Sequence, residues 1–172
     1  MATEKRTVPD TLAGERDGLE EWLEFHRETL AVKCRDLDEK QLREATVPPS
    51  ELSLLGLVRH MAEVERHWFR RILSDEDAGP LYYTDEDEDG DFHPGEGDTW
   101  EEAYATWQEE IVRARGLAAE RVSLDEVSLG RHPRSGKRYN LRWIYLHMIE
   151  EYARHNGHAD FLRERIDGAT GD

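Results

Sequence analysis

The chain has 172 residues, which is enough for one domain with a sizeable hydrophobic core and too few for two of ordinary size, so we expect residues 1–172 to form a single domain. Its 39 Asp and Glu residues outnumber its 23 Lys and Arg residues, and the net charge of −16 disfavours nucleic acids and anionic membrane surfaces as partners. One cysteine excludes an intramolecular disulfide, and the lack of an N-terminal apolar run predicts a cytoplasmic protein.

Apolar residues recur at three- and four-residue spacings in four stretches, which indicates helices and predicts an all-α protein. The first helix is expected over residues 15–34 and is followed by a short helical turn that ends at a Pro-Pro pair. The second is expected over residues 51–73, where Ser50 and Ser53 supply start signals. The residues expected to face inward from these two helices are Leu19, Trp22, Leu23, Phe25, His26, Leu30, Val32, Leu54, Leu57, Val58, Met61, Val64, Trp68 and Ile72.

A long acidic connection, rich in Gly and Pro, separates the second helix from the third. A connection of this length often serves function, although a solvated linker is the ordinary alternative. The third helix is expected over residues 98–119, with Thr99 as its N-cap and Glu102 completing a capping box. A basic segment, either a loop or a short hairpin, then leads to Asn140, the expected N-cap of a fourth helix over residues 140–166. Because four amphipathic helices can bury their apolar faces together, we predict a four-helix bundle with the acidic loop between helices two and three.

The fourth helix contains the segment HMIEEYARHNGHAD, in which His147, Glu151, His155 and His158 share one stripe. Residues four apart on a helix lie about 40° from one another, so Glu151 and His155 face the same way. A carboxylate and an imidazole at this spacing can coordinate one metal ion, but further ligands must come from another helix. For His147 and His158 a core or supporting role is favoured over ligation. The stripe is expected to point inward because it is flanked by Ile144, Met148, Tyr152 and Phe161.

The second helix offers His60, on its apolar side, as the further ligand. A lone buried histidine is more often a hydrogen-bonded core residue than a ligand, so both interpretations stay open for His60 taken alone. Its neighbours Glu63 and Glu65 are expected to lie in solvent, with orientation of His60 as the alternative. His67 is expected to lie beyond the site, near Trp68.

The sequence LLGLVRHMAEVE around His60, with EYARHNGHAD far downstream, resembles the DinB superfamily of metal-binding helical bundles. Members commonly hold a divalent metal with one histidine from the second helix and an HxxxH pair from the last. Here Glu151 replaces the first histidine of that pair, as it does in the mycothiol-dependent maleylpyruvate isomerases, which points to the thiol-transferase branch that includes the mycothiol S-transferases. The resemblance implies His60, Glu151 and His155 as ligands of zinc, with nickel as the alternative metal. Three protein ligands leave a position for water or substrate, as in catalytic zinc sites.

The basic segment GRHPRSGKRYNLRW and the single cysteine are the remaining candidates. Simple neutralisation of the acidic surface is the ordinary interpretation of the segment, and the alternative is recognition of carboxylates of a thiol cofactor or substrate, with Arg138 and Arg142 as the candidate contacts. Cys34 ends the first helix without a local His or Asp motif to activate it, which favours a structural role over that of a nucleophile.

Two classes of function are compatible with these residues. The resemblance favours a metal-dependent enzyme, a thiol S-transferase that joins a low-molecular-weight thiol such as mycothiol or bacillithiol to an electrophile. The opposing class is a non-catalytic metal-binding stress or interaction protein in which the metal is structural and only stabilises the packing of the helices. An Arg-rich, Lys-poor composition is compatible with an actinobacterial source, where mycothiol is the thiol, and a homodimer is compatible with either class.

Overall fold

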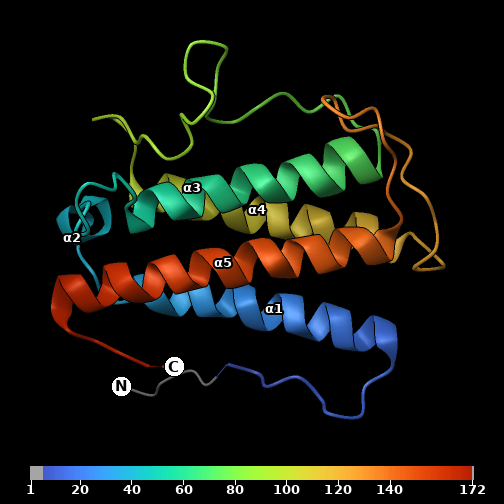
Figure 1. Ribbon diagram of the computed structural model, residues 1–172, viewed down its shortest axis with the longest axis horizontal. Coiled ribbons are helices and arrows are strands. Elements are labelled where there is room, and N and C mark those ends of the chain that lie inside the picture. The colour runs from blue at the N-terminus through green and yellow to red at the C-terminus, as the bar shows by residue number, and fades with distance from the viewer. Residues whose placement is uncertain (1–5, 172) are drawn as a thin grey trace.

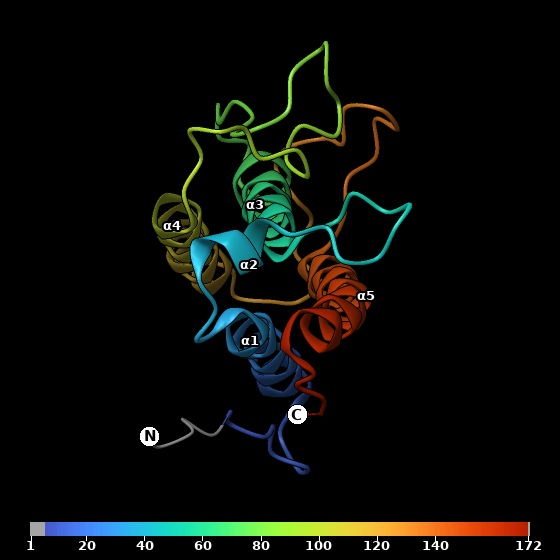
Figure 2. The ribbon, with the colours of Figure 1, turned by 90° about the vertical axis from the view of Figure 1, so that its left-hand side faces the viewer.

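Four long helices form a bundle in the computed structural model, which describes residues 6–171 (Figures 1 and 2). The described residues contain no strand, so the all-α prediction is confirmed. None of these helices is long and apolar enough to cross a membrane. The elements in chain order are α1 Glu15–Cys34, the short α2 Glu39–Arg43, α3 Leu54–Glu65 continued by the π-helical η1 Arg66–Leu73, α4 Trp100–Ala119 and α5 Leu141–Asp167.

The helices run in two parallel pairs. In Figure 1, α1 and α5 run in one direction along the bundle while α3 and α4 run in the other. This arrangement requires residues 74–99 to return the chain along the length of the molecule, and the predicted acidic connection is this crossover. Figure 2 shows the four helices around a common axis, with the crossover over the outer side of α3.

Side-chain caps fix where the helices begin. Ser53 Oγ accepts a hydrogen bond from the amide of Gly56, at 3.1 Å, so α3 begins at Leu54 and the predicted start at residue 51 was three residues early. Thr99 caps α4, but the Glu102 carboxylate accepts from the Thr99 hydroxyl rather than from its backbone. Asn140 caps α5 as predicted, through a 2.9 Å bond from the amide of Trp143.

The hydrophobic core excludes some residues that the apolar pattern placed in it. Leu23 and Leu30 of α1 are buried, whereas Trp22 on the same helix is 48% exposed and Phe161 of α5 is 68% exposed, so the inward placement of these two aromatic residues was wrong. Trp22 instead packs against the ring of Phe25, at 5.7 Å between centroids. In a bundle each helix buries only the stripe that its two neighbours cover, and an aromatic residue at the border of that stripe can remain outside.

A polar network links all four long helices at the centre of the bundle. Arg27 of α1 donates two hydrogen bonds to the Glu65 carboxylate of α3, at 2.8 and 2.6 Å. Tyr152 of α5 donates to the same carboxylate at 2.7 Å, and its hydroxyl accepts from the indole N–H of Trp107 in α4 at 2.8 Å. Glu65 is fully buried, so its expected position in solvent was wrong. A buried charge requires such partners, and here one carboxylate holds three helices in register.

Candidate metal site

The imidazole of His60 projects from α3 with its two nitrogens in different surroundings. Nδ1 lies 2.8 Å from a carboxylate oxygen of Asp91, a buried residue of the acidic connection. Because a carboxylate accepts in this contact, the hydrogen bond favours the tautomer of the neutral imidazole with the proton on Nδ1 and the lone pair on Nε2, the form in which histidine binds metals. The ring of Phe92 stacks on the imidazole, at 4.2 Å between centroids. His60 is therefore fixed in both tautomer and plane.

Glu151 and His155 face one another along α5. His155 Nε2 lies 3.5 Å from one carboxylate oxygen of Glu151, and His147 Nε2 lies 3.4 Å from the other. The contact with His155, followed by the positive potential of His147 and His60, lowers the pKa of Glu151 despite its partial burial. Nδ1 of His155 lies 3.3 Å from Nδ1 of His158. Glu151 is thus held as a carboxylate, the form that a metal requires.

His60, Glu151 and His155 meet at one point between α3 and α5. Within residues 6–171, they form a group whose donor atoms all lie within 4.8 Å of one another, and the rings of the two histidines are 4.6 Å apart. Two atoms bound to one tetrahedral zinc ion are roughly 3.4 Å apart, close to the spacing between His155 and Glu151. Two imidazoles and one carboxylate are a common donor set for zinc, so these residues fit the metal.

Each of the three residues has an outer partner that holds it in place. Asp91 fixes His60, and on α5 His147 and His158 contact Glu151 and His155 respectively. The supporting role of the two α5 histidines stays a prediction. His147 also forms a second donor group with Glu151 and the exposed Glu150, but Glu150 is ion-paired with Arg154 at 2.6 Å.

A cleft of about 610 Å³ opens beside His60. The acidic connection forms one wall, which includes Tyr83, Asp91 and Phe92, and η1 and the basic segment form the other. Arg71, in the η1 wall, donates to the Tyr83 hydroxyl at 2.7 Å. His67 also faces the cleft, and burial lowers the pKa of its imidazole to about 4, so it is neutral at physiological pH. A cleft of this volume can hold a small organic molecule.

The sequence did not indicate several of these residues. Asp91 and Phe92 lie within a run of acids that reads as solvated linker, and nothing in that run distinguishes the buried Asp91 from the exposed acids that precede it. Glu63 was expected in solvent but is buried, and its carboxylate accepts from the amides of Leu81 and Tyr82 at 2.7 and 3.2 Å. The prediction for Glu63 was wrong because the connection folds back over α3.

The basic segment forms an irregular loop, with one isolated bridge between Val127 and Asn140. Arg142 lies in the first turn of α5 and is ion-paired with Glu15 and Asp125, contacts that raise its pKa. At 1.5 Å per residue, it is roughly 13 Å along the helix from Glu151. Arg138 is exposed and, within the described chain, has no ion-pair partner. These positions neither add to the metal group nor line the cleft.

Cys34 is buried at the end of α1, and burial raises the pKa of its thiol to about 12. A thiol that stays protonated is a poor nucleophile, which agrees with the structural role expected for it.

A family model described as mycothiol S-transferase matches residues 18–168, which include all three residues of the metal group. The chain belongs to the mycothiol S-transferase family. Membership of this family confirms the resemblance to the DinB superfamily and to its thiol-transferase branch. A search of curated proteins finds no match.

Proposed function

We propose that this mycothiol S-transferase family member is a metal-dependent enzyme that joins a low-molecular-weight thiol, mycothiol, to an electrophilic small molecule. The observation that carries the proposal is the convergence of His60, Glu151 and His155 within 4.8 Å of one another, with His60 also lining a cleft of about 610 Å³. A structural metal that only stabilises helix packing needs no such cleft, and structural zinc sites typically have a closed set of four protein ligands.

The proposed ligands are Nε2 of His60, the carboxylate of Glu151 and Nε2 of His155. Zinc suits two imidazoles and a carboxylate, and nickel is the alternative. When bound, a divalent ion supplies positive charge that lowers the pKa of a coordinated thiol and keeps its sulfur in the nucleophilic thiolate form. The site would release the thiol proton to solvent.

The residues of the chain orient the reactants. Asp91 and His147 hold two of the proposed ligands, and the cleft, which His60 lines, would place the electrophile beside that histidine. The thiol sulfur then forms a bond to the electrophilic carbon, and the leaving group departs with the electron pair of the bond that breaks. Arg138 and Arg142 remain the proposed contacts for carboxylates of the thiol or substrate, and Arg142 would first have to leave Glu15.

The remaining expectations belong to the same proposal. A single domain, a cytoplasmic location, an actinobacterial source and small-molecule partners without nucleic acid or membrane all suit an enzyme of thiol metabolism. A homodimer is compatible with it.

The experiment compares metal content and thiol transfer in matched variants. His155→Ala and Glu151→Gln each remove one proposed ligand, whereas Glu164→Gln makes the same amide substitution at an exposed position of α5. Zinc affinity should fall by at least about 10- to 100-fold in the first two variants, and mycothiol conjugation in a screen of several thiols and electrophiles should fall with it. The Glu164→Gln control should keep both its zinc affinity and its conjugation activity.

Two outcomes would contradict the proposal. Undiminished transfer by metal-free protein would remove the metal from the reaction. Ligand variants that lose metal and fail to fold, with no transfer by the zinc-loaded wild type, would favour the non-catalytic protein with a structural metal.

A further inference from the structure

One face of α3 receives the acidic connection. It consists of Gly56, Arg59, His60 and Glu63, at positions i, i+3, i+4 and i+7 of one helix. Glu63 accepts from the backbone of residues 81–82, in the first half of the connection. His60 contacts Asp91 near its far end. A metal ligand therefore stands in the middle of a docking surface.

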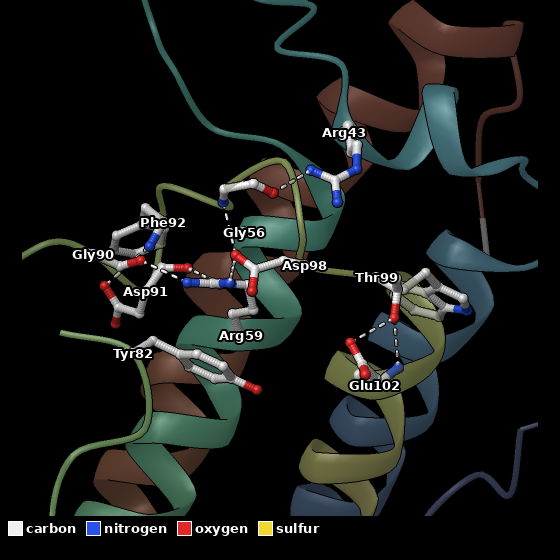
Figure 3. Close-up of polar contacts among 12 residues, drawn as sticks. Arg43, Gly56, Arg59, Tyr82, Gly90, Asp91, Phe92, Asp98, Thr99 and Glu102 are labelled. Carbon is white, nitrogen blue, oxygen red and sulfur yellow. Dashed lines mark hydrogen bonds and ion pairs between the residues drawn. The ribbon is translucent and has the colours of Figure 1, made fainter.

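Arg59 is the main anchor of the segment beside His60 (Figure 3). Its guanidinium donates to the carbonyls of Gly90 and Asp91, at 2.8 and 3.1 Å, and forms an ion pair with Asp98. The ring of Tyr82 covers the guanidinium at 4.2 Å. Arg59 is 4% exposed, so these contacts replace nearly all of its hydration. The backbone of residues 90–91 is fixed by a buried charge rather than by weak surface contacts.

Gly56 allows the backbone of the connection to touch the helix. A Cβ atom at this position would lie 2.9 Å from the carbonyl oxygen of Phe92 and 3.3 Å from its Cα. Those atoms belong to the backbone and cannot rotate away as a side chain would. Even an alanine at position 56 would push residues 91–92 outward, away from His60.

We propose that the docked acidic connection is a metal-linked wall of the site: Asp91 positions His60 for ligation, and metal binding in turn holds residues 74–99 against α3. The inference rests on the proposed metal site. Asp91 is a positioning residue in this scheme, since it acts through His60. Because the coupling of two equilibria is reciprocal, whatever docking contributes to metal affinity, metal contributes to docking.

The coupling extends to the cleft. Residues 83–92 supply one cleft wall, so metal binding also completes the space for the electrophile. The acidic connection is then a functional element rather than a solvated linker. The expected order of events is metal first and electrophile second.

The decisive variant is Gly56→Ala, which alters no proposed ligand and no side chain of the site. Its matched control is Gly116→Ala, since Gly116 is also helical but a Cβ there would meet nothing within 4 Å. Zinc affinity, measured by competition with a chromophoric chelator, should fall by about 10- to 100-fold in Gly56→Ala and stay unchanged in the control. Asp91→Ala should give a similar loss. The double variant should lose little more than either single variant, because both act through His60.

Protease Glu-C provides a second readout, because the connection carries exposed glutamates at positions 86 and 88. Zinc should slow cleavage there in the wild type and in Gly116→Ala, but not in Asp91→Ala. The coupling alone would be overturned by three results together. The wild type binds zinc, zinc does not change the rate at which it is cleaved, and Gly56→Ala and Asp91→Ala bind zinc with the affinity of the wild type. A wild type that binds no zinc would overturn the proposed function itself. Should Gly56→Ala fail to fold, the zinc affinity of Asp91→Ala and its rate of cleavage with and without zinc test the coupling.

Discussion

Glu65 is the shared acceptor at the centre of the bundle, and its removal tests how the two helices that carry the proposed ligands are held together. It lies on α3, which carries His60, and it accepts from Tyr152, the residue that follows Glu151 on α5. In Glu65→Ala the guanidinium of Arg27, with 5% of its side chain exposed, would keep Glu24 as its ion-pair partner but lose the buried carboxylate.

The expected loss follows from leaving a buried charge without its main partner. Breaking a buried pair from one side costs about 3–5 kcal/mol, out of a total stability of about 5–15 kcal/mol. For a chain of this length, each kcal/mol lowers the midpoint of thermal unfolding by about 2–4 °C, so Glu65→Ala should unfold about 6–20 °C below the wild type. Tyr152→Phe removes only a hydroxyl and leaves the Trp107 indole without its acceptor, which should cost about 1–3 kcal/mol.

Urea unfolding of metal-free protein, followed by circular dichroism, measures these differences directly. The double variant Arg27→Met with Glu65→Leu removes both charges and should be more stable than Glu65→Ala, because an apolar pair of similar volume needs no compensating partner. A Glu65→Ala protein within about 1 kcal/mol of the wild type would refute the argument, since ordinary surface substitutions cost that little. A double variant less stable than Glu65→Ala would refute it equally.

Three further predictions follow from single residues. Burial lowers the pKa of His67 to about 4, so below pH 6.5 the unfolded chain binds a proton that the folded chain does not. As the pH falls from 6.5 to 4, the free energy of unfolding should drop by up to about 1.4 kcal/mol per pH unit on this account, and His67→Gln should remove that part of the slope. Cys34 should react with Ellman's reagent only after denaturation, and rapid labelling of folded protein would contradict its burial. Gly168 caps α5 with φ of 77°, so Gly168→Ala should cost about 1 kcal/mol in the same urea assay, whereas an unchanged midpoint would show that the cap does not matter.

Much of the fold was accessible from the sequence because it rests on local periodicity, and the same periodicity paired two of the three proposed ligands. Apolar spacing located the four long helices, and a side chain four residues from another on a helix must share its face whatever the tertiary structure is. Glu151 and His155 could therefore be paired in advance. Their link to His60 came from the resemblance to a family, since periodicity does not say which helices are neighbours.

Only the tertiary structure decided what lies around that group. Trp22 and Phe161 have the same local pattern as buried residues, and their exposure depends on which neighbouring helix covers each border of the stripe. Glu63, Glu65 and Asp91 are acids in an acid-rich chain, and their burial depends on partners far away in sequence: Leu81 and Tyr82 for Glu63, Arg27 and Tyr152 for Glu65, and His60 for Asp91. A charged side chain is buried only where the fold supplies such partners, and composition records the charge without recording the partner.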